Sequence, residues 1–453
     1  MDNEPTRVSA SPGLHRKVAW RVLPLVVTCY LFAYIDRINI GFAKEQISTD
    51  VGLTEAMFGF GAGIFFIGYV IFEVPSNLLM TRIGARKTFT RILVLWGITS
   101  VSMVFVRDPI SFYALRFLLG VFEAGFAPGM ILFATYWFPR ARMATVMGIL
   151  MIPSPLGSMI GAPMSSSIIY YFDGIFELSG WQWMFIIEGI PCIILAVFVW
   201  KTLADNPRKA KWLTETELAQ LTAEIEADKP TGSHSQSSFS DVLTNPRVYA
   251  IAACYFAIIS AQYAIAFYLP TIIKESGGIT STLQVGLWAA IPFAVAIPMM
   301  QYMGRRSDRH RERHLHAIFA IIIGAVALFV AAIGAHIFIL SMAALVIATA
   351  FIWSAYTVFW AIPSSFLSGS AAAGGIAFIN SIGLLGGFFA PTLIGYTRQI
   401  TGASASGLIA ICAVLVVGAI ALFFSRSIKT IEPIHSLPQL STPANEKTTI
   451  IGE

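Results

Sequence analysis

Twelve apolar runs, each long enough to cross a lipid bilayer as a helix, constrain this chain of 453 residues more than any other feature. A helix needs about 20 mostly apolar residues to span the hydrocarbon layer, where its backbone groups bond one another. The runs therefore predict an all-α membrane protein with twelve transmembrane helices. They lie at about 19–41, 57–80, 88–106, 110–134, 144–171, 183–203, 247–272, 283–303, 315–335, 338–362, 371–396 and 406–425.

Composition agrees with lipid as the surrounding solvent. Charged residues make up only 12% of the chain, against about 25% in soluble domains. The net charge of +5 does not indicate a nucleic-acid partner, because membrane proteins collect Lys and Arg in their cytoplasmic loops. The four cysteines lie inside apolar runs without CxxC spacing, so we expect them to form neither a disulfide nor a metal site. No cofactor is expected, with a proton as the coupling ion.

One long polar stretch divides the spans into six and six. We expect a cytoplasmic tail at 1–18, a first six-helix bundle at 19–203, a central loop at 204–246, a second bundle at 247–425 and a second tail at 426–453. Within the loop, Thr214 and Glu217 have the spacing of a capping box, which predicts a short surface helix. A serine-rich linker, TGSHSQSS, follows this predicted helix.

The distribution of Lys and Arg predicts the orientation. With both termini in the cytoplasm, 24 of the 30 Lys and Arg residues fall on the cytoplasmic side, 4 on the opposite side and 2 inside spans. Cytoplasmic loops of membrane proteins carry such an excess. We therefore expect a multi-pass protein of the inner, cytoplasmic membrane with both ends inside the cell.

Ionisable residues inside the spans are the strongest candidates for function. Each costs about 2.5–3.5 kcal/mol at a helix centre, so it persists only where it pairs or lines a wet pathway. Four of them, Asp36, Arg37, Arg116 and Glu123, are expected to converge on one shared pocket. We expect structural roles for two further acids: Glu73 as a partner of loop arginines, and Glu188 as an interfacial or packing acid.

Short motifs resemble the major facilitator superfamily, whose members have this layout of six plus six helices. Its loop signature appears in altered form as NLLMTRIGARK, with Thr81 where an acid usually stands. The matching segment GRRSDRHRER follows the eighth span. The resemblance implies that these segments latch the two halves together, through the residues Arg82, Gly84 and Arg86 in the first and Gly304, Asp308 and Arg309 in the second.

The first span resembles more narrowly the anion:cation symporter family, through its YIDRIN core. Similar stretches are GYVIFEVPSNLL, RFLLGVFEAGFAPG and FINSIGLLGGFFAP. Within that family the chain most resembles bacterial permeases for tartrate, sugar acids such as galactonate, and 4-hydroxyphenylacetate. The resemblance implies proton handling by Asp36 and Glu123, and substrate contacts from Arg37, Arg116, Tyr34, Tyr69, Ser154, Thr357, Trp360 and Asn380. Ser154 replaces a Gln of the sugar-acid carriers, which favours tartrate-like compounds over galactonate.

The predicted function is proton-coupled uptake of a small organic carboxylate by rocking of the two halves. A facilitator or exchanger of organic anions without proton coupling is the alternative. An enzyme is not expected, because no nucleophile elbow or metal-spaced His/Glu set is visible. The predicted partners are the carboxylate, protons and the lipid bilayer, and the superfamily resemblance implies a monomer.

Overall fold

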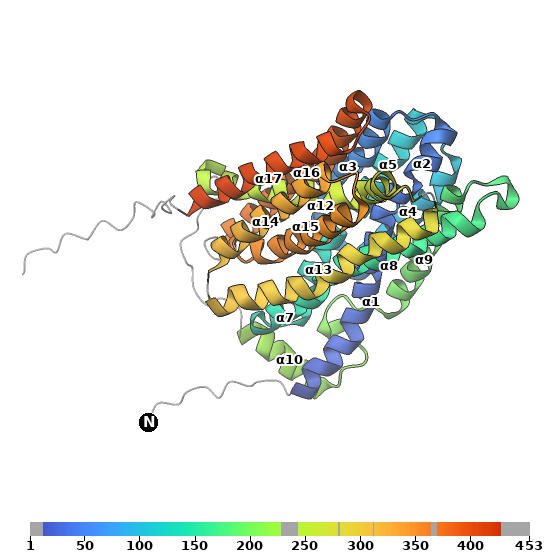
Figure 1. The fold of residues 1–453 in the computed structure, drawn as a ribbon. Helices are drawn as coiled ribbons and strands as arrows, with labels where there is room; N and C mark the ends of the chain where they lie inside the picture. Colours follow the sequence, from blue (N-terminus) through green and yellow to red (C-terminus); the bar gives the residue numbers. More distant parts are fainter. Residues whose placement is uncertain (1–11, 228–242, 280, 311, 364–368, 427–453) are drawn as a thin grey trace, which may run out of the picture.

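A computed structural model describes residues 12–227, 243–279, 281–310, 312–363 and 369–426. Most of both predicted tails and the serine-rich linker lie outside the described residues. Within them, twelve helical segments are long and apolar enough to cross a membrane, as the sequence predicts. Figure 1 shows them as a bundle of long, tilted helices.

The first six spans are built from nine helices, because three of the spans are broken. The helices are α1 (Pro12–Ile38), α2 (Ile40–Val51), α3 (Glu55–Ile83), α4 (Ala85–Ser102), α5 (Pro109–Glu123), α6 (Phe126–Trp137), α7 (Arg140–Met151), α8 (Pro153–Phe172) and α9 (Gly180–Thr202). The last six spans are single helices: α12 (Pro246–Gly277), α13 (Thr282–His310), α14 (Arg313–Ile333), α15 (Phe338–Phe359), α16 (Gly369–Thr401) and α17 (Ala405–Ser425).

The breaks have identifiable causes. Gly125, between α5 and α6, has a φ of +86°, which residues with a Cβ rarely adopt. A Cβ there would also lie 2.6 Å from the Ser76 hydroxyl of α3. The fifth span breaks at Ile152, just before Pro153 and Pro155, whose rings remove backbone donors. The first span breaks at Asn39, whose side chain takes part in the site described below.

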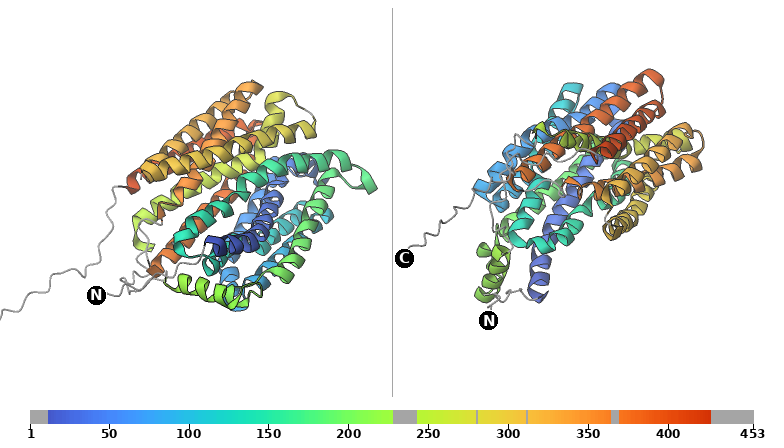
Figure 2. Two further views of the ribbon diagram at one scale, coloured as in Figure 1. Left: turned by 90° about the horizontal axis from the view of Figure 1, so that it is seen from below. Right: turned by 90° about the vertical axis from the view of Figure 1, so that its left-hand side faces the viewer.

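The two sets of six spans lie mostly on opposite sides of the molecule, as the blue-to-green and yellow-to-red helices of Figure 2 show. They meet mainly where α3 packs against α16 and α8 packs against α13. A Cβ at Gly59 of α3 would lie 2.2 Å from the carbonyl oxygen of Pro391 in α16. Glycine therefore permits the close approach of these helices, as small residues do in other membrane bundles.

A short helix after the sixth span marks one end of the bundle. This helix, α10 (Glu215–Ala227), begins with the predicted capping box, because the backbone N–H of Thr214 donates to Glu217 at 3.0 Å and the Glu217 N–H donates to Thr214 at 3.3 Å. Lys17 of α1 forms an ion pair with Glu217 at 2.7 Å. We call this end of the bundle the α10 end; Figure 1 shows α10 beside the start of α1 there.

The first loop motif also lies at the α10 end, but its acidic partner comes from elsewhere in the chain. Gly84 has a φ of +89° and approaches Asp205, which follows α9. The Asp205 carboxylate accepts a 2.8 Å hydrogen bond from the Arg86 backbone N–H and pairs with Lys209 at 3.0 Å. Arg82 is exposed. Asp205 thus supplies the carboxylate that the motif lacks at Thr81, within the first half of the chain.

The second motif lies on a helix and not in a loop. Gly304, Asp308 and Arg309 all belong to α13, which continues to His310. Asp308 lies 3.8 Å from the Arg313 guanidinium at the start of α14. The contact therefore joins two neighbouring helices of the second half.

Candidate functional site

Arg37 is a buried charged residue that contacts both halves of the chain. It lies on the last turn of α1 and is only 5% exposed. One guanidinium nitrogen pairs with Glu123 at the end of α5, and the other donates to the Tyr263 hydroxyl of α12 at 2.9 Å. The predicted proximity of Arg37 and Glu123 is therefore observed, and Tyr263 adds a contact from the second half.

Aromatic rings surround this guanidinium. Its central carbon lies 5.3 Å from the ring centroid of Tyr34, 5.5 Å from that of Phe65 and 5.4 Å from that of Tyr69. Rings at this distance attract a cation through their negative faces. Tyr34 and Tyr69, both expected at the substrate site, therefore lie beside Arg37. An anion that approaches Arg37 would also meet their hydroxyl-bearing rings.

Arg116 is placed differently from the prediction. It is fully buried on α5, and it donates hydrogen bonds to backbone carbonyls of α3, at Gly61 (3.4 Å) and Ala62 (3.2 Å). It also lies 5.3 Å from the Phe65 ring. Its third nitrogen, Nη1, is buried without a hydrogen-bond partner among the described residues. Arg116 therefore links α5 to α3 and does not form an ion pair with Asp36 or Glu123. Its charge still interacts with both acids over a longer range.

Asp36 also departs from the expected single pocket. Its carboxylate accepts hydrogen bonds from Trp96 at 2.7 Å and Ser100 at 2.5 Å, both on α4 of the first half. Asn39 donates to it at 3.5 Å. Successive positions on a helix point about 100° apart, which separates Asp36 from Arg37. Asp36 therefore lies inside the first six-helix bundle, away from the contact between halves.

Glu188 belongs to the same polar group as Asp36. It lies on α9, is 1% exposed, and accepts hydrogen bonds from Ser165 of α8 at 2.7 Å and from Asn39 at 2.8 Å. Asn39 thus donates to two carboxylates at once. Of the two alternatives expected for Glu188, an interfacial acid is wrong, because Glu188 is buried in a hydrogen-bonded network, and a packing acid remains.

The second half contributes a polar and aromatic group around Tyr255 of α12. The Trp360 ring lies 4.9 Å from the Tyr255 ring, and the Tyr255 hydroxyl lies 3.5 Å from the Asn380 side-chain oxygen. Asn380 donates at 2.7 Å to Glu73 of α3, across the contact between halves. Glu73 therefore pairs with Asn380 and not with the loop arginines, which corrects the sequence-based expectation.

Two expected residues, Ser154 and Thr357, remain. Ser154 is buried on α8, one turn before Gly157, where a Cβ would lie 2.7 Å from the Tyr34 Cβ. Thr357 is exposed on α15 and bonds its own helix through the Trp353 carbonyl at 3.1 Å. The roles of both residues in substrate binding stay predictions.

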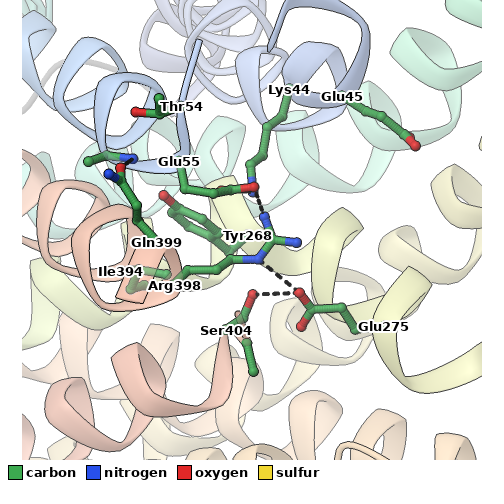
Figure 3. Close-up of polar contacts among 12 residues, drawn as sticks. Lys44, Glu45, Thr54, Glu55, Tyr268, Glu275, Ile394, Arg398, Gln399 and Ser404 are labelled. Carbon is green, nitrogen blue, oxygen red and sulfur yellow. Dashed lines mark hydrogen bonds and ion pairs between the residues drawn. The ribbon is translucent and has the colours of Figure 1, made fainter. Parts of the chain in front are cut away.

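Ion pairs join the halves at the end opposite α10. Arg398 of α16 pairs with Glu55 of α3 and, at 2.9 Å, with Glu275 of α12, and Figure 3 shows it between these two acids. Lys44 of α2 pairs with Glu55 at 2.7 Å, and Lys274 pairs with Glu45. These six charged residues, which we call the six-charge cluster, line an open pocket of about 340 Å³.

The sequence analysis did not identify several of these residues as part of the site, although the sequence contained indications of some of them. Asn39 belongs to the YIDRIN core, and Lys44, Lys274 and Arg398 are three of the four cations expected opposite the cytoplasm. Three scarce cations on one side could have indicated partner acids there. Tyr263, Trp96 and Ser100 gave no such signal, because a hydroxyl or indole in an apolar helix is common.

Comparison with known proteins identifies the architecture. The family model of the Major Facilitator Superfamily matches residues 26–391. The chain belongs to this superfamily. It is therefore a multi-pass membrane transporter. A buried charged site at the contact between the two bundles is consistent with the small molecules that transporters of this superfamily carry.

Three similar members of the superfamily have curated names. A protein named as a tartrate transporter in Agrobacterium vitis is 43% identical over 91% of this chain and 94% of its own length. One named as metabolite transport protein NicT in Pseudomonas putida is 41% identical over 87% and 90%. A protein named quinolone resistance transporter in Acinetobacter baumannii is 40% identical over 89% and 93%. The three names do not indicate the same transported compound.

Solved structures of superfamily members share the fold. A bacterial homologue of the lysosomal transporter Spinster has a TM-score of 0.72 at 16% identity, covering 92% of this chain and 98% of its own. The xylose transporter XylE from E. coli has a TM-score of 0.69 at 15% identity, covering 90% and 97%.

Proposed function

We propose that this transporter carries a small organic anion into the cell together with a proton. The observation that carries the proposal is the position of Arg37. It is buried, it pairs with Glu123 of its own half, and it donates to Tyr263 of the other half. A cation at this place can bind a substrate carboxylate. Its contact with Tyr263 also depends on the relative position of the two halves.

Exchange of partners at Arg37 would couple the anion to the proton. The planar guanidinium group of arginine can donate two parallel hydrogen bonds to one carboxylate. When a substrate carboxylate takes the place of Glu123, that acid loses its cation in a buried site. An isolated carboxylate is unstable there and binds a proton. The loaded site is then closer to neutral, which lowers the cost of moving it across the membrane interior.

The ion pairs between the halves support alternating access. In the conformation described here, the six-charge cluster joins α2 and α3 to α12 and α16 at the end opposite α10. The excess of Lys and Arg favours a cytoplasmic location for the α10 end and both termini, in an inner membrane. The cluster would then hold the two halves together at the outer end. A monomer is proposed from the superfamily resemblance.

A tartrate-like hydroxy acid is the substrate we propose first. Arg37 suits one carboxylate, and the neighbouring Tyr34 and Tyr69 supply hydroxyl groups that bond substrate hydroxyls. The 43% identical relative is named as a tartrate transporter. Sugar acids and hydroxy-aromatic carboxylates share the same chemistry and form the comparison set.

Uptake by purified protein in liposomes tests this function. Radiolabelled L-tartrate should accumulate when the outside is more acidic than the lumen, and an ionophore that collapses the pH gradient should stop accumulation. Glu123→Gln should lose this accumulation and keep exchange of labelled for unlabelled tartrate. Accumulation that is independent of the pH gradient in the wild type would contradict proton coupling and favour the facilitator or exchanger.

A thermal-shift series checks the substrate separately. A bound ligand raises the midpoint of unfolding by mass action. L-tartrate should raise the unfolding midpoint of the wild type and not that of Arg37→Ala. The shifts produced by sugar acids and hydroxy-aromatic carboxylates rank these compounds as alternative substrates. Stabilisation by a sugar acid alone would replace tartrate in the proposal and leave proton coupling standing.

A further inference from the structure

Glu188 is a buried acid for which the mechanism above has no use. It is 1% exposed, and its two oxygens accept hydrogen bonds from uncharged donors, Ser165 at 2.7 Å and Asn39 at 2.8 Å. Among the described residues, no Lys, Arg or His nitrogen lies within 4.0 Å of its carboxylate. A buried acid without a cation is stable chiefly in its protonated form.

Asp36 is the charged residue that shares a hydrogen-bond donor with Glu188. Asn39 donates to Glu188 and also, at 3.5 Å, to Asp36, so one amide joins the two acids. Their charges interact directly. Two carboxylates that share a site cannot both ionise without a large repulsion, so one of them holds a proton.

Hydrogen-bond donors indicate which acid holds it. Asp36 accepts from Trp96 and Ser100 in addition to Asn39, and the charge of Arg116 also reaches it. Burial opposes the ionised form of both acids, and these donors offset that cost at Asp36 more than the two donors of Glu188 do. Glu188 has one donor fewer, and the Ser165 hydroxyl can accept a hydrogen bond from protonated Glu188 as readily as it donates one to the carboxylate.

The other groups packed around Glu188 do not supply a compensating charge. Its own helix contributes Cys192, whose thiol donates to the Glu188 backbone carbonyl, and α4 contributes Ser100 near Gly189. The Cys29 thiol of α1 lies close to Cys192. The first bundle thus buries three acids, Asp36, Glu123 and Glu188, and the two arginines 37 and 116, and Arg116 interacts with both Asp36 and Glu123 over a longer range. One proton makes the total charge of these five residues zero.

We infer that Glu188 is a second proton-coupling residue, which binds and releases a proton during transport while Asp36 sets its charge. The inference rests on the proposed proton symport and adds to it a site inside the first bundle. Arg37 and Glu123 bind the anion at the contact between halves, whereas Asn39, Asp36 and Glu188 store the proton beside it. Transport would then move more protons than the Glu123 exchange alone.

Glu188→Gln tests the inference, because glutamine keeps the shape and can still bond Ser165 and Asn39. The matched control is Glu177→Gln, the same substitution at an exposed position just before α9. Infrared difference spectra between acidic and alkaline pH report protonated carboxyl groups without any substrate. Glu188→Gln should remove a protonated-carboxyl band that Glu177→Gln retains.

Tartrate transport in liposomes supplies the second readout. Glu188→Gln should lower accumulation driven by a pH gradient roughly tenfold or more, with exchange of labelled for unlabelled tartrate close to the wild-type rate. Glu188→Asp, which retains a titratable group, should recover part of the accumulation. A purely structural role would instead lower accumulation and exchange together.

Each contrary outcome has a distinct meaning. An unchanged infrared band overturns the inference, and so does a lost band with unchanged accumulation, because Glu188 would then keep its proton throughout. Equal loss of accumulation and exchange overturns it as well. If the wild type itself shows no accumulation driven by the pH gradient, the proposed symport fails first, whatever the variants do.

Discussion

Asp36 and Arg37 are adjacent in the chain, yet their side chains bind partners in different parts of the protein. Asp36 accepts hydrogen bonds from Trp96 and Ser100 inside the first six-helix bundle. Arg37 pairs with Glu123 and reaches Tyr263 of the second bundle. The single motif that carries both residues therefore supplies a carboxylate and a guanidinium to two separate environments.

Replacing Arg37 by lysine should lower tartrate uptake roughly tenfold or more, although the charge is kept. A lysine ammonium lacks the planar fork and cannot bind Glu123 and Tyr263 from two separate nitrogens. The initial rate of uptake at several tartrate concentrations measures the effect. Arg107→Lys, at an exposed position, serves as the control and should transport normally. Wild-type uptake by Arg37→Lys would show that the fork geometry has no role.

Tyr263→Phe should slow transport while leaving the fold intact. The ring packs against Phe66 at a centroid distance of 4.4 Å, and phenylalanine preserves that packing. The hydroxyl accepts from the Arg37 guanidinium, and a hydrogen bond to a charged group contributes about 1.5–3 kcal/mol. Rates of uptake and exchange should therefore both fall. Tyr249→Phe, whose hydroxyl bonds an exposed carbonyl, is the matched control; equal effects in both variants would argue against a special contact at Arg37.

Weakening the six-charge cluster should open the end of the bundle opposite α10. Ser48 lines the pocket there, and all four native cysteines are buried, so Ser48→Cys gives a specific site for thiol labelling. Adding Glu55→Gln removes the acid shared by Lys44 and Arg398. Labelling by a membrane-impermeant maleimide should then become several-fold faster, because partly exposed pairs contribute about 1 kcal/mol or less each.

The labelling experiment has an internal check. High salt screens exposed charges and should speed labelling of the Ser48→Cys protein that retains Glu55, with less effect once Glu55 is glutamine. Identical labelling rates with and without Glu55 would show that the ion pairs do not hold this end closed.

Asp205 should stabilise the α10 end in a manner that depends on pH. Partial burial raises the pKa of its carboxyl, but the Arg86 backbone N–H and the Lys209 ammonium lower that pKa further, so the net shift is downward. A lowered pKa means that the stabilisation is present above the unfolded value of about 4 and is lost as the pH falls through the folded value. Asp205→Asn should lower the melting temperature at neutral pH, and the difference should shrink in acid. A difference that is constant with pH would contradict this role.

The sequence could predict much of the site but not its connections. Burial cost alone marked six ionisable residues inside the spans as exceptional, because hydrocarbon does not tolerate lone charges. They are Asp36, Arg37, Glu73, Arg116, Glu123 and Glu188. It could not say that Arg116 would bond backbone carbonyls of α3, or that Asn380 would reach Glu73 across the two halves. Those pairings depend on which helices lie side by side.

The sequence by itself determined the membrane-spanning helices, because the length and apolarity of each run follow from local residues and from the thickness of a bilayer. It also determined the capping of α10, since Thr214 and Glu217 are three residues apart. Only the tertiary structure decided that Asn39 joins Asp36 to Glu188, and that Arg398 bridges Glu55 and Glu275. Side-chain partners distant in sequence depend on helix rotation and packing, and no local pattern encodes either of these.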